Sequence, residues 1–376
     1  MTRIEELLNN FREIAYNPEK QMAKYKAEGK KIIGCFPYYV PEEIVYAAGM
    51  VPFGVWGTHG TISRAKEYFA SFYCTIAQMN LEMALEGKFD GLSGVILSSM
   101  CDTLRPLTQN FKVAIPQLPF MFLAHPQNRK PEYGIKFTMH EFSRVKGQLE
   151  EIAGHKIEDE KMFEAFKVYN ESRATRREFV KLAGKHPEAI SAVNRSAVLK
   201  SAFFMLKDEH TAMLKELNAE LAKLPEVKWD GIKVLTSGII LDNPKLLSIF
   251  DEYKVAIVAD DVAHESRAFT TDVPMDIEDP IRALAVQFAN QDNDTILYDP
   301  LIEERPKYVA NKAKEAGADG VVVVMMQFCD PEEMEYPSLR KALDEAGLPH
   351  IKFGFDQQMV DFGQARTSLQ AFAESL

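Results

Sequence analysis

Two segments of the chain, more than two hundred residues apart, share one pattern: an apolar run rich in β-branched residues that ends in Cys-Asp. The first is Gly94–Asp102 (GVILSSMCD) and the second is Gly320–Asp330 (GVVVVMMQFCD). Continuous apolar runs of this kind are typical of parallel strands that are covered on both faces. The repetition therefore predicts an α/β fold made of two related, doubly wound parallel-sheet lobes.

A helix-like stretch follows each Cys-Asp pair. Cys101 and Cys329 are therefore expected at the carboxyl end of a strand, where a helix begins. Open α/β sheets bind ligands at this edge. Free backbone N–H groups and the helix dipole also favour a thiolate there. The two thiols together suggest a soft-metal site built between the lobes.

A repeated strand–helix–strand unit supports the duplication. In the first unit, a strand at Lys31–Gly34 precedes a helix opened by Pro41 and a strand at Val51–Trp56. Proline in the first helical turn is a common start signal. The second unit has the same parts in the same order, at Lys233–Ser237, Pro244 and Val255–Ala259.

Strand signals disappear in residues 136–228, between the two lobes. Apolar residues recur there at helical spacing in three stretches, namely Glu141–Ile152, Glu160–Leu182 and His210–Leu224. A chain of 376 residues is also long enough for more than one domain. We expect an N-terminal helical arm and α/β lobe (1–135), a helical connecting domain (136–228) and a C-terminal α/β lobe (229–376).

Composition and short motifs exclude several classes of function. The formal net charge is -11 and no basic stripe is evident, which argues against a nucleic-acid partner. The longest apolar runs, such as Val321–Met326, are too short to cross a membrane. The first residues predict an amphipathic helix and not a signal peptide, so we expect a cytoplasmic protein. The usual ATP-binding and dinucleotide-binding glycine motifs are absent from the sequence.

Cys74 lies in a segment that the sequence allows to fold in two ways. If Ser71 is the N-cap of a helix, Cys74 falls at the third helical position. If one long helix runs from Ile62 to Gly87, Cys74 is in mid-helix and lies off the main apolar stripe. Neither alternative makes Cys74 an obvious core residue.

The four cysteines of a large chain of this kind are not a disulfide framework, so their thiols are inert core residues, metal ligands or nucleophiles. The spacing of Cys74, Cys101 and Cys329 matches no compact zinc or ferredoxin pattern. No histidine can be placed beside a cysteine from the sequence. Cys35 ends the first predicted strand and is either a small buried residue or a fourth thiol.

Two polar segments follow predicted strands. His125–Arg129 follows Phe120–Ala124, and Asp260–Arg267 follows Val255–Ala259. Loops in this position are where an acyl-CoA or a partner protein would be contacted. The alternative is that these residues cap helices and form ion pairs between the lobes.

Several motifs taken together make the chain similar to a known family. They are Phe328–Glu333 (FCDPEE), Cys101–Leu104 (CDTL), Gly34–Glu43 (GCFPYYVPEE) and His125–Arg129 (HPQNR). The chain resembles the 2-hydroxyacyl-CoA dehydratase family, which also includes the subunits of benzoyl-CoA reductase. The likeness covers essentially the whole chain, including Phe362–Ala365 near its end.

The resemblance implies a lyase subunit with a 4Fe-4S cluster held by Cys74, Cys101 and Cys329, whose fourth iron has a non-cysteine ligand. Cys35 lies outside that pattern. The family works as a heterodimer with an alpha subunit, which holds the acyl-CoA, and an ATP-dependent 4Fe-4S activator delivers one electron. This chain would relay that electron. The resemblance assigns no catalytic residue to this chain, and it leaves open whether a flavin (FMN) also binds.

The chemistry expected from the resemblance is a radical dehydration in an anaerobe that ferments glutamate. One electron added to the thioester carbonyl expels the α-hydroxide and acidifies the β-hydrogen, and the electron is then returned. The expected substrate is (R)-2-hydroxyglutaryl-CoA, which would give glutaconyl-CoA. The alternatives are a subunit of a benzoyl-CoA reductase-type enzyme and a two-lobed binding protein without a metal.

Overall fold

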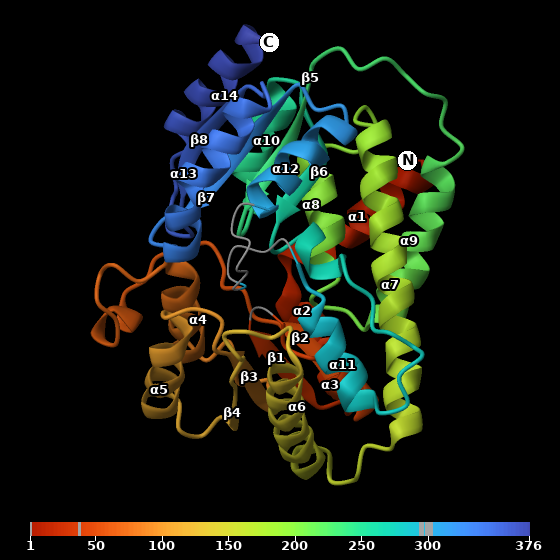
Figure 1. Ribbon diagram of the computed structural model, residues 1–376, viewed down its shortest axis with the longest axis vertical. Coiled ribbons are helices and arrows are strands. Elements are labelled where there is room, and N and C mark those ends of the chain that lie inside the picture. The colour runs from red at the N-terminus through yellow and green to blue at the C-terminus, as the bar shows by residue number, and fades with distance from the viewer. Residues whose placement is uncertain (1, 37–38, 293–296, 298–303) are drawn as a thin grey trace.

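The computed structural model describes residues 2–36, 39–292, 297 and 304–376 and shows two α/β lobes (Figure 1). Each lobe contains a four-stranded sheet whose strands are all parallel. The predicted fold class is therefore confirmed. The strands of the first sheet are β1 (Ile32–Phe36), β2 (Val51–Gly54), β3 (Gly94–Ser98) and β4 (Phe120–Leu123). Those of the second are β5 (Ile232–Gly238), β6 (Val255–Val262), β7 (Gly320–Met326) and β8 (His350–Phe355).

The two sheets have the same strand order. It is β2-β1-β3-β4 in the first lobe and β6-β5-β7-β8 in the second. β3 and β7 therefore occupy equivalent positions, each beside the first strand of its own sheet. Every residue of both strands is buried, which explains their unbroken apolar sequences.

Helices cover the sheets and connect the lobes. In the first lobe and the arm before it they are α1 (Arg3–Tyr16), α2 (Pro18–Ala27), α3 (Glu42–Ala47), α4 (Thr75–Leu85) and α5 (Leu104–Ala114). The connecting helices are α6 (Glu132–Ala153), α7 (Asp159–Lys185), α8 (Ala192–Ser201) and α9 (Lys207–Leu221). The rest of the chain adds α10 (Pro244–Glu252), α12 (Glu304–Glu315), α13 (Asp330–Glu345) and α14 (Gly363–Ser375) to the second lobe, whereas α11 (Pro280–Ala289) packs on α6 beside the first lobe.

The connecting helices include the three predicted stretches, as parts of α6, α7 and α9. The sequence does not predict α8, because this helix is buried almost all round and shows no amphipathic pattern. α7 contacts α3 of the first lobe and β6 of the second, and α1 packs on α8 and α9. The proposed domain boundaries stay a prediction.

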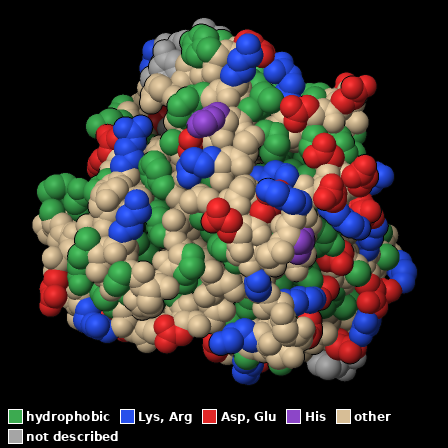
Figure 2. Space-filling view, turned by 90° about the horizontal axis from the view of Figure 1, so that it is seen from below, with side chains coloured by type: hydrophobic (Ala, Val, Ile, Leu, Met, Phe, Trp, Pro, Cys, Tyr) green, Lys and Arg blue, Asp and Glu red, His purple; other side chains and the backbone are tan. Residues whose placement is uncertain are grey.

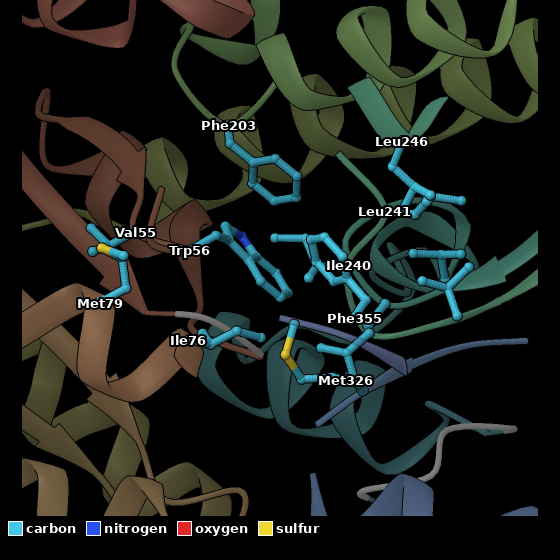
Figure 3. Close-up of a cluster of buried hydrophobic side chains, with 14 of the residues drawn as sticks. Val55, Trp56, Ile76, Met79, Phe203, Ile240, Leu241, Leu246, Met326 and Phe355 are labelled. Atoms are coloured by element: carbon cyan, nitrogen blue, oxygen red, sulfur yellow. The ribbon is translucent and has the colours of Figure 1, made fainter. Parts of the chain in front are cut away.

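One hydrophobic core extends through both lobes. Figure 3 shows Val55, Trp56, Ile76 and Met79 of the first lobe facing Ile240, Leu241, Met326 and Phe355 of the second. The chain approaches itself closely here, since Gly54 N donates to Phe203 O at 2.7 Å. A Cβ atom on Gly54 would lie 2.6 Å from Phe203 Cβ, so this position requires glycine.

The surface and the helices agree with two expectations drawn from composition. Basic and acidic side chains are interspersed over the described part of the face shown in Figure 2. No described helix is long and apolar enough to cross a membrane.

Candidate cysteine site at the junction of the lobes

Cys101 and Cys329 lie where the sequence predicts them, between a strand and a helix. Cys329 is the N-cap residue of α13 and follows β7, with Pro331 in the first helical turn. Cys101 lies between the end of β3 and the N-cap residue of α5, Thr103. The equivalent positions of β3 and β7 thus place one thiol at the carboxyl edge of each sheet.

Cys74 is itself the N-cap residue of α4, so it lies at the start of a helix as the first expectation has it, but the cap is Cys74 and not Ser71, and the long helix is wrong. A long helix from residue 62 cannot form because Glu82 holds the upstream segment. The Glu82 carboxylate accepts hydrogen bonds from the backbone N–H groups of Ser63 (3.1 Å), Arg64 (3.2 Å) and Ala65 (2.7 Å). These bonds fix a short 3₁₀ turn at Arg64–Glu67, and the helix starts only at Thr75.

The start of α4 is tied directly to the second lobe. Thr75 Oγ1 accepts a hydrogen bond from Gln357 N at 3.0 Å and donates to Met326 Sδ at 3.6 Å. Gln357 Nε2 in turn donates to Trp56 O at 2.9 Å. Cys74 therefore lies beside the end of β7. Cys329 follows closely after that strand in the sequence.

The structure brings Cys74, Cys101 and Cys329 into electrostatic contact. Burial raises the pKa of Cys74 to about 12, and negative charge on Cys101 adds to this effect. Burial also raises the pKa of Cys329, with further contributions from Glu332, Cys74 and Cys101. Burial is likewise the main cause of the raised pKa of Cys101. All three side chains pack against the core shared by the lobes.

Cys35 occupies a different environment. It lies within β1 and is buried in the core between that sheet and α6, α7 and α11. Its Sγ donates to Ile33 O at 3.6 Å, and burial raises its pKa well above the ordinary value. Cys35 is therefore a core residue on the opposite side of the first sheet from the other three cysteines. This position agrees with leaving Cys35 out of the ligand set.

The donor set of this site is three cysteine thiols, the ligand type that iron–sulfur clusters take. Among the described residues, no three His, Cys, Asp or Glu side chains are placed to hold one metal ion. A 4Fe-4S cluster is larger and accepts thiolates at separate corners. Burial keeps the three thiols protonated, and a bound cluster would displace those protons and neutralise the thiolates.

The turn before Cys329 is held by two acidic side chains that the sequence analysis did not identify as part of the site. Met326 N donates to Glu332 Oε2 at 3.1 Å and Phe328 N donates to Glu333 Oε1 at 3.0 Å. Burial raises the pKa of Glu332 to about 7. The signal for this role was the Pro-Glu-Glu sequence in the first turn of a helix that follows a cysteine.

The two polar segments expected to contact a ligand differ in burial, and Asp260–Arg267 is buried throughout. Asp260 and Asp261 belong to β6 and not to a loop, which corrects the prediction. Asp260 pairs with Arg195, and Asp261 pairs with Arg267 at 3.0 Å and with Arg305. The buried strand can include these two aspartates because buried arginines neutralise their charges.

In the segment His125–Arg129 only Arg129 is buried, His125 is half-buried and Gln127 is exposed. The His125 ring lies 4.5 Å from the Phe288 ring, and burial lowers the pKa of His125 to about 3. Arg129 pairs with Asp292 at 3.0 Å. These contacts match the alternative of ion pairing and packing. Pro37 and Tyr38 of the Gly34–Glu43 motif lie outside the described residues.

Large exposed apolar side chains flank the cysteines. Phe72 (64% exposed) precedes Cys74 by two residues, and Phe328 (45%) directly precedes Cys329. Met334 (80%) lies in α13, and Val360 (81%) lies between β8 and α14. We call these four side chains the flanking apolar group. Phe72 and Phe328 adjoin a cysteine in sequence, and exposed apolar side chains beside a site are typical of a surface that a partner covers.

Comparisons with known proteins agree over nearly the full length. The family model described as 2-hydroxyglutaryl-CoA dehydratase, D-component, matches residues 37–376. The chain is 57% identical to (R)-2-hydroxyglutaryl-CoA dehydratase, subunit beta, of Acidaminococcus fermentans, over 99% of this chain and 100% of that protein. It is 43% identical to the (R)-phenyllactyl-CoA dehydratase beta subunit of Clostridium sporogenes, over 100% of both. It is 27% identical to a benzoyl-CoA reductase subunit of Thauera aromatica, over 92% of this chain and 91% of that protein.

Proposed function

The chain belongs to the 2-hydroxyglutaryl-CoA dehydratase D-component family, and from this premise we propose that it is the beta subunit of a radical 2-hydroxyacyl-CoA dehydratase. Such an enzyme is a hydro-lyase. The proposed substrate of the assembled enzyme is (R)-2-hydroxyglutaryl-CoA. The identity of 57% to the subunit named for that substrate supports this choice over 27% to the benzoyl-CoA reductase subunit.

Within this proposal, Cys74, Cys101 and Cys329 hold a 4Fe-4S cluster. The observation that carries it is that three partly buried thiols from both lobes interact electrostatically at one junction, each at or near the start of a helix. When bound, the cluster would supply a one-electron carrier. Buried Met326, which shares a core with the three cysteines, would exclude water from it, and a dry surrounding tunes the potential of a bound cluster.

The partners in this proposal are an alpha subunit that holds the acyl-CoA and an ATP-dependent activator that delivers the electron. The flanking apolar group would be covered by the alpha subunit, since permanent interfaces are large and apolar. The activator contact would be small and brief, as electron-transfer contacts are. A cytoplasmic location belongs to the same proposal.

The cluster assignment is tested with Cys329→Ser, purified anaerobically together with the alpha subunit. Serine is nearly isosteric but is a poor ligand for a soft metal site. We expect the variant to assemble, to lose part of its iron and to lose most of the dehydratase activity. Cys35→Ala is the matched control and should keep its iron. Full iron and full activity in Cys329→Ser would remove Cys329 from the site.

The relay role is tested by leaving out the alpha subunit. The cluster-loaded chain is mixed with activator, ATP, a strong reductant and (R)-2-hydroxyglutaryl-CoA. We expect no glutaconyl-CoA to form, and steady product formation would make this chain the catalytic subunit instead. Flavin released from the same preparation by denaturation would be detected by its fluorescence, which tests whether FMN binds.

A further inference from the structure

A cavity whose lining does not include Cys74, Cys101 or Cys329 lies where the first lobe, α7 and α11 meet. Its volume is about 100 Å³, and its walls include residues between β1 and α3, from α7 and from α11. A buried water needs roughly 10–15 Å³ of such space. The cavity therefore has room for a small organic molecule.

The two walls of the cavity differ in chemistry. One wall is aromatic and includes Trp56, Phe203 and Phe288. Figure 3 shows the Trp56 and Phe203 side chains lying close together at the junction of the lobes, and their rings are 5.6 Å apart. The other wall is charged, with side chains from α3, α7 and the start of α9. A ligand of matching shape would have an apolar body and one polar end.

Two of the three cations on the charged wall have carboxylate partners. Lys207 Nζ lies 2.8 Å from Glu42 Oε2, and Tyr169 donates a hydrogen bond to the same carboxylate at 3.2 Å. Arg173 pairs with Glu43. These two cations are therefore neutralised within the protein.

The third cation, Arg176, has no such partner among the described residues. Its side chain lies on the cavity wall and the residue is 4% exposed. Within the described chain its one hydrogen bond runs from Nε to Ser172 O at 3.3 Å, and its guanidinium lies 4.8 Å from the Phe269 ring centre. Burial lowers the pKa of Arg176 to about 10, and the charge of Arg173 contributes to this. A buried, unpaired guanidinium is a costly arrangement that a bound anion would relieve.

We propose that this cavity binds a small monocarboxylate, whose carboxylate pairs with Arg176 and whose apolar body packs against Trp56 and Phe203. The guanidinium presents a planar fork of donors that fits a carboxylate. Three cations face two protein carboxylates, so one further negative charge balances the cavity. A second negative charge on the ligand would be repelled by Glu42 and Glu43. None of the proposed iron ligands, Cys74, Cys101 and Cys329, lines the site, which does not depend on iron.

The test is a set of ligand titrations of the full chain, in its purified complex, followed by calorimetry and thermal unfolding. Butyrate is the probe, and butyramide is its neutral counterpart of the same size. Glutarate carries a second charge, and sodium chloride controls for ionic strength. We expect butyrate to bind and to raise the melting temperature. Butyramide and glutarate should bind at least about tenfold more weakly, because a charge-assisted pair is lost or a repulsion is added.

Two variants make the assignment specific to Arg176. Arg176→Gln should weaken butyrate binding at least about tenfold, and without ligand it should melt no lower than the wild type, since it removes an unpaired buried charge. Arg177→Gln is the matched control, because Arg177 is the next residue of α7 but pairs with Asp272 outside the cavity lining. It should bind butyrate as the wild type does.

Two outcomes would overturn the proposal. One is equal binding of butyrate and butyramide, or no binding of either. The other is a ligand-free Arg176→Gln that melts well below the wild type while butyrate shifts neither protein, since Arg176 would then serve only to pack on Phe269. Neither outcome bears on the iron content, so failure here is distinct from failure of the proposed cluster.

Discussion

Phe328 is the residue at which the backbone beside the cysteines is strained. Its φ angle is 60°, in the left-handed region that non-glycine residues seldom adopt, and its side chain is 45% exposed. The hydrogen bond from Phe328 N to Glu333 holds this conformation. The strain fixes the direction in which the chain enters α13 and so positions Cys329.

Replacing Phe328 with glycine should relieve this strain. We expect Phe328→Gly to raise the free energy of unfolding by about 0.5–1 kcal/mol, the difference between the left-handed penalty and the entropy that glycine loses on folding. Denaturant unfolding measures the change. Phe72→Gly is the control, since Phe72 is exposed but has no positive φ. A loss of stability in Phe328→Gly matching that of the control would show that the conformation carries no strain.

Glu265 gives the protein a pH-dependent stability. Burial and the charge of Asp260 raise its pKa to about 7, although it pairs with Arg195. A carboxyl whose folded pKa is raised contributes stability that is fully present below the unfolded pKa and is lost as pH rises through the folded value. The free energy of unfolding should therefore fall by about 1 kcal/mol between pH 6 and pH 8 through this group alone.

Glu265→Gln tests this assignment, because glutamine keeps the size of the side chain and does not titrate. Denaturant unfolding at both pH values should show a smaller decline in the variant by about that amount. An identical decline in both proteins would place the pKa of Glu265 near its ordinary value.

At the scale of elements, the contact between α4 and the second lobe depends on one hydroxyl group. Thr75→Val leaves the buried backbone N–H of Gln357 without its acceptor. We expect the free energy of unfolding to fall by about 1–3 kcal/mol, the penalty for an unsatisfied buried donor. Thr61→Val is the control, because Thr61 is exposed. A loss no larger than in the control would mean that the contact does not join the lobes.

The strands are predictable from sequence, and the start of α4 is not. β3 and β7 are buried on both faces, so their apolar, β-branched runs identify them without any knowledge of the rest. Sequence reasoning misplaces Cys74 because the start of α4 depends on Glu82, which reaches back to backbone groups about seventeen residues earlier. It assigns Asp260 and Asp261 to a loop because two of their arginine partners, Arg195 and Arg305, come from distant parts of the chain. Local sequence patterns predict elements whose burial is fixed within the element itself. They do not predict features that depend on a side chain far away in the sequence.

At the scale of the whole molecule, the flanking apolar group should be the surface that meets the alpha subunit. Met334→Glu places a charge on an 80% exposed side chain, so the fold should be unaffected. We expect affinity for the alpha subunit to fall at least about tenfold, as is usual when a central interface residue is lost. Sedimentation or co-purification measures it. Val227→Glu, on a 51% exposed side chain between α9 and β5, is the control. Unchanged assembly of Met334→Glu would move the interface elsewhere.

The core shared by the lobes has a consequence for synthesis on the ribosome. Leu97 of β3 and Met326 of β7 belong to the same cluster, yet they are separated by most of the chain. At about 5–20 residues per second, the second emerges on the order of 10–50 s after the first. During that interval the first lobe exposes an apolar face that nothing yet made can cover. We expect the nascent chain to be prone to aggregation until β7 has been translated.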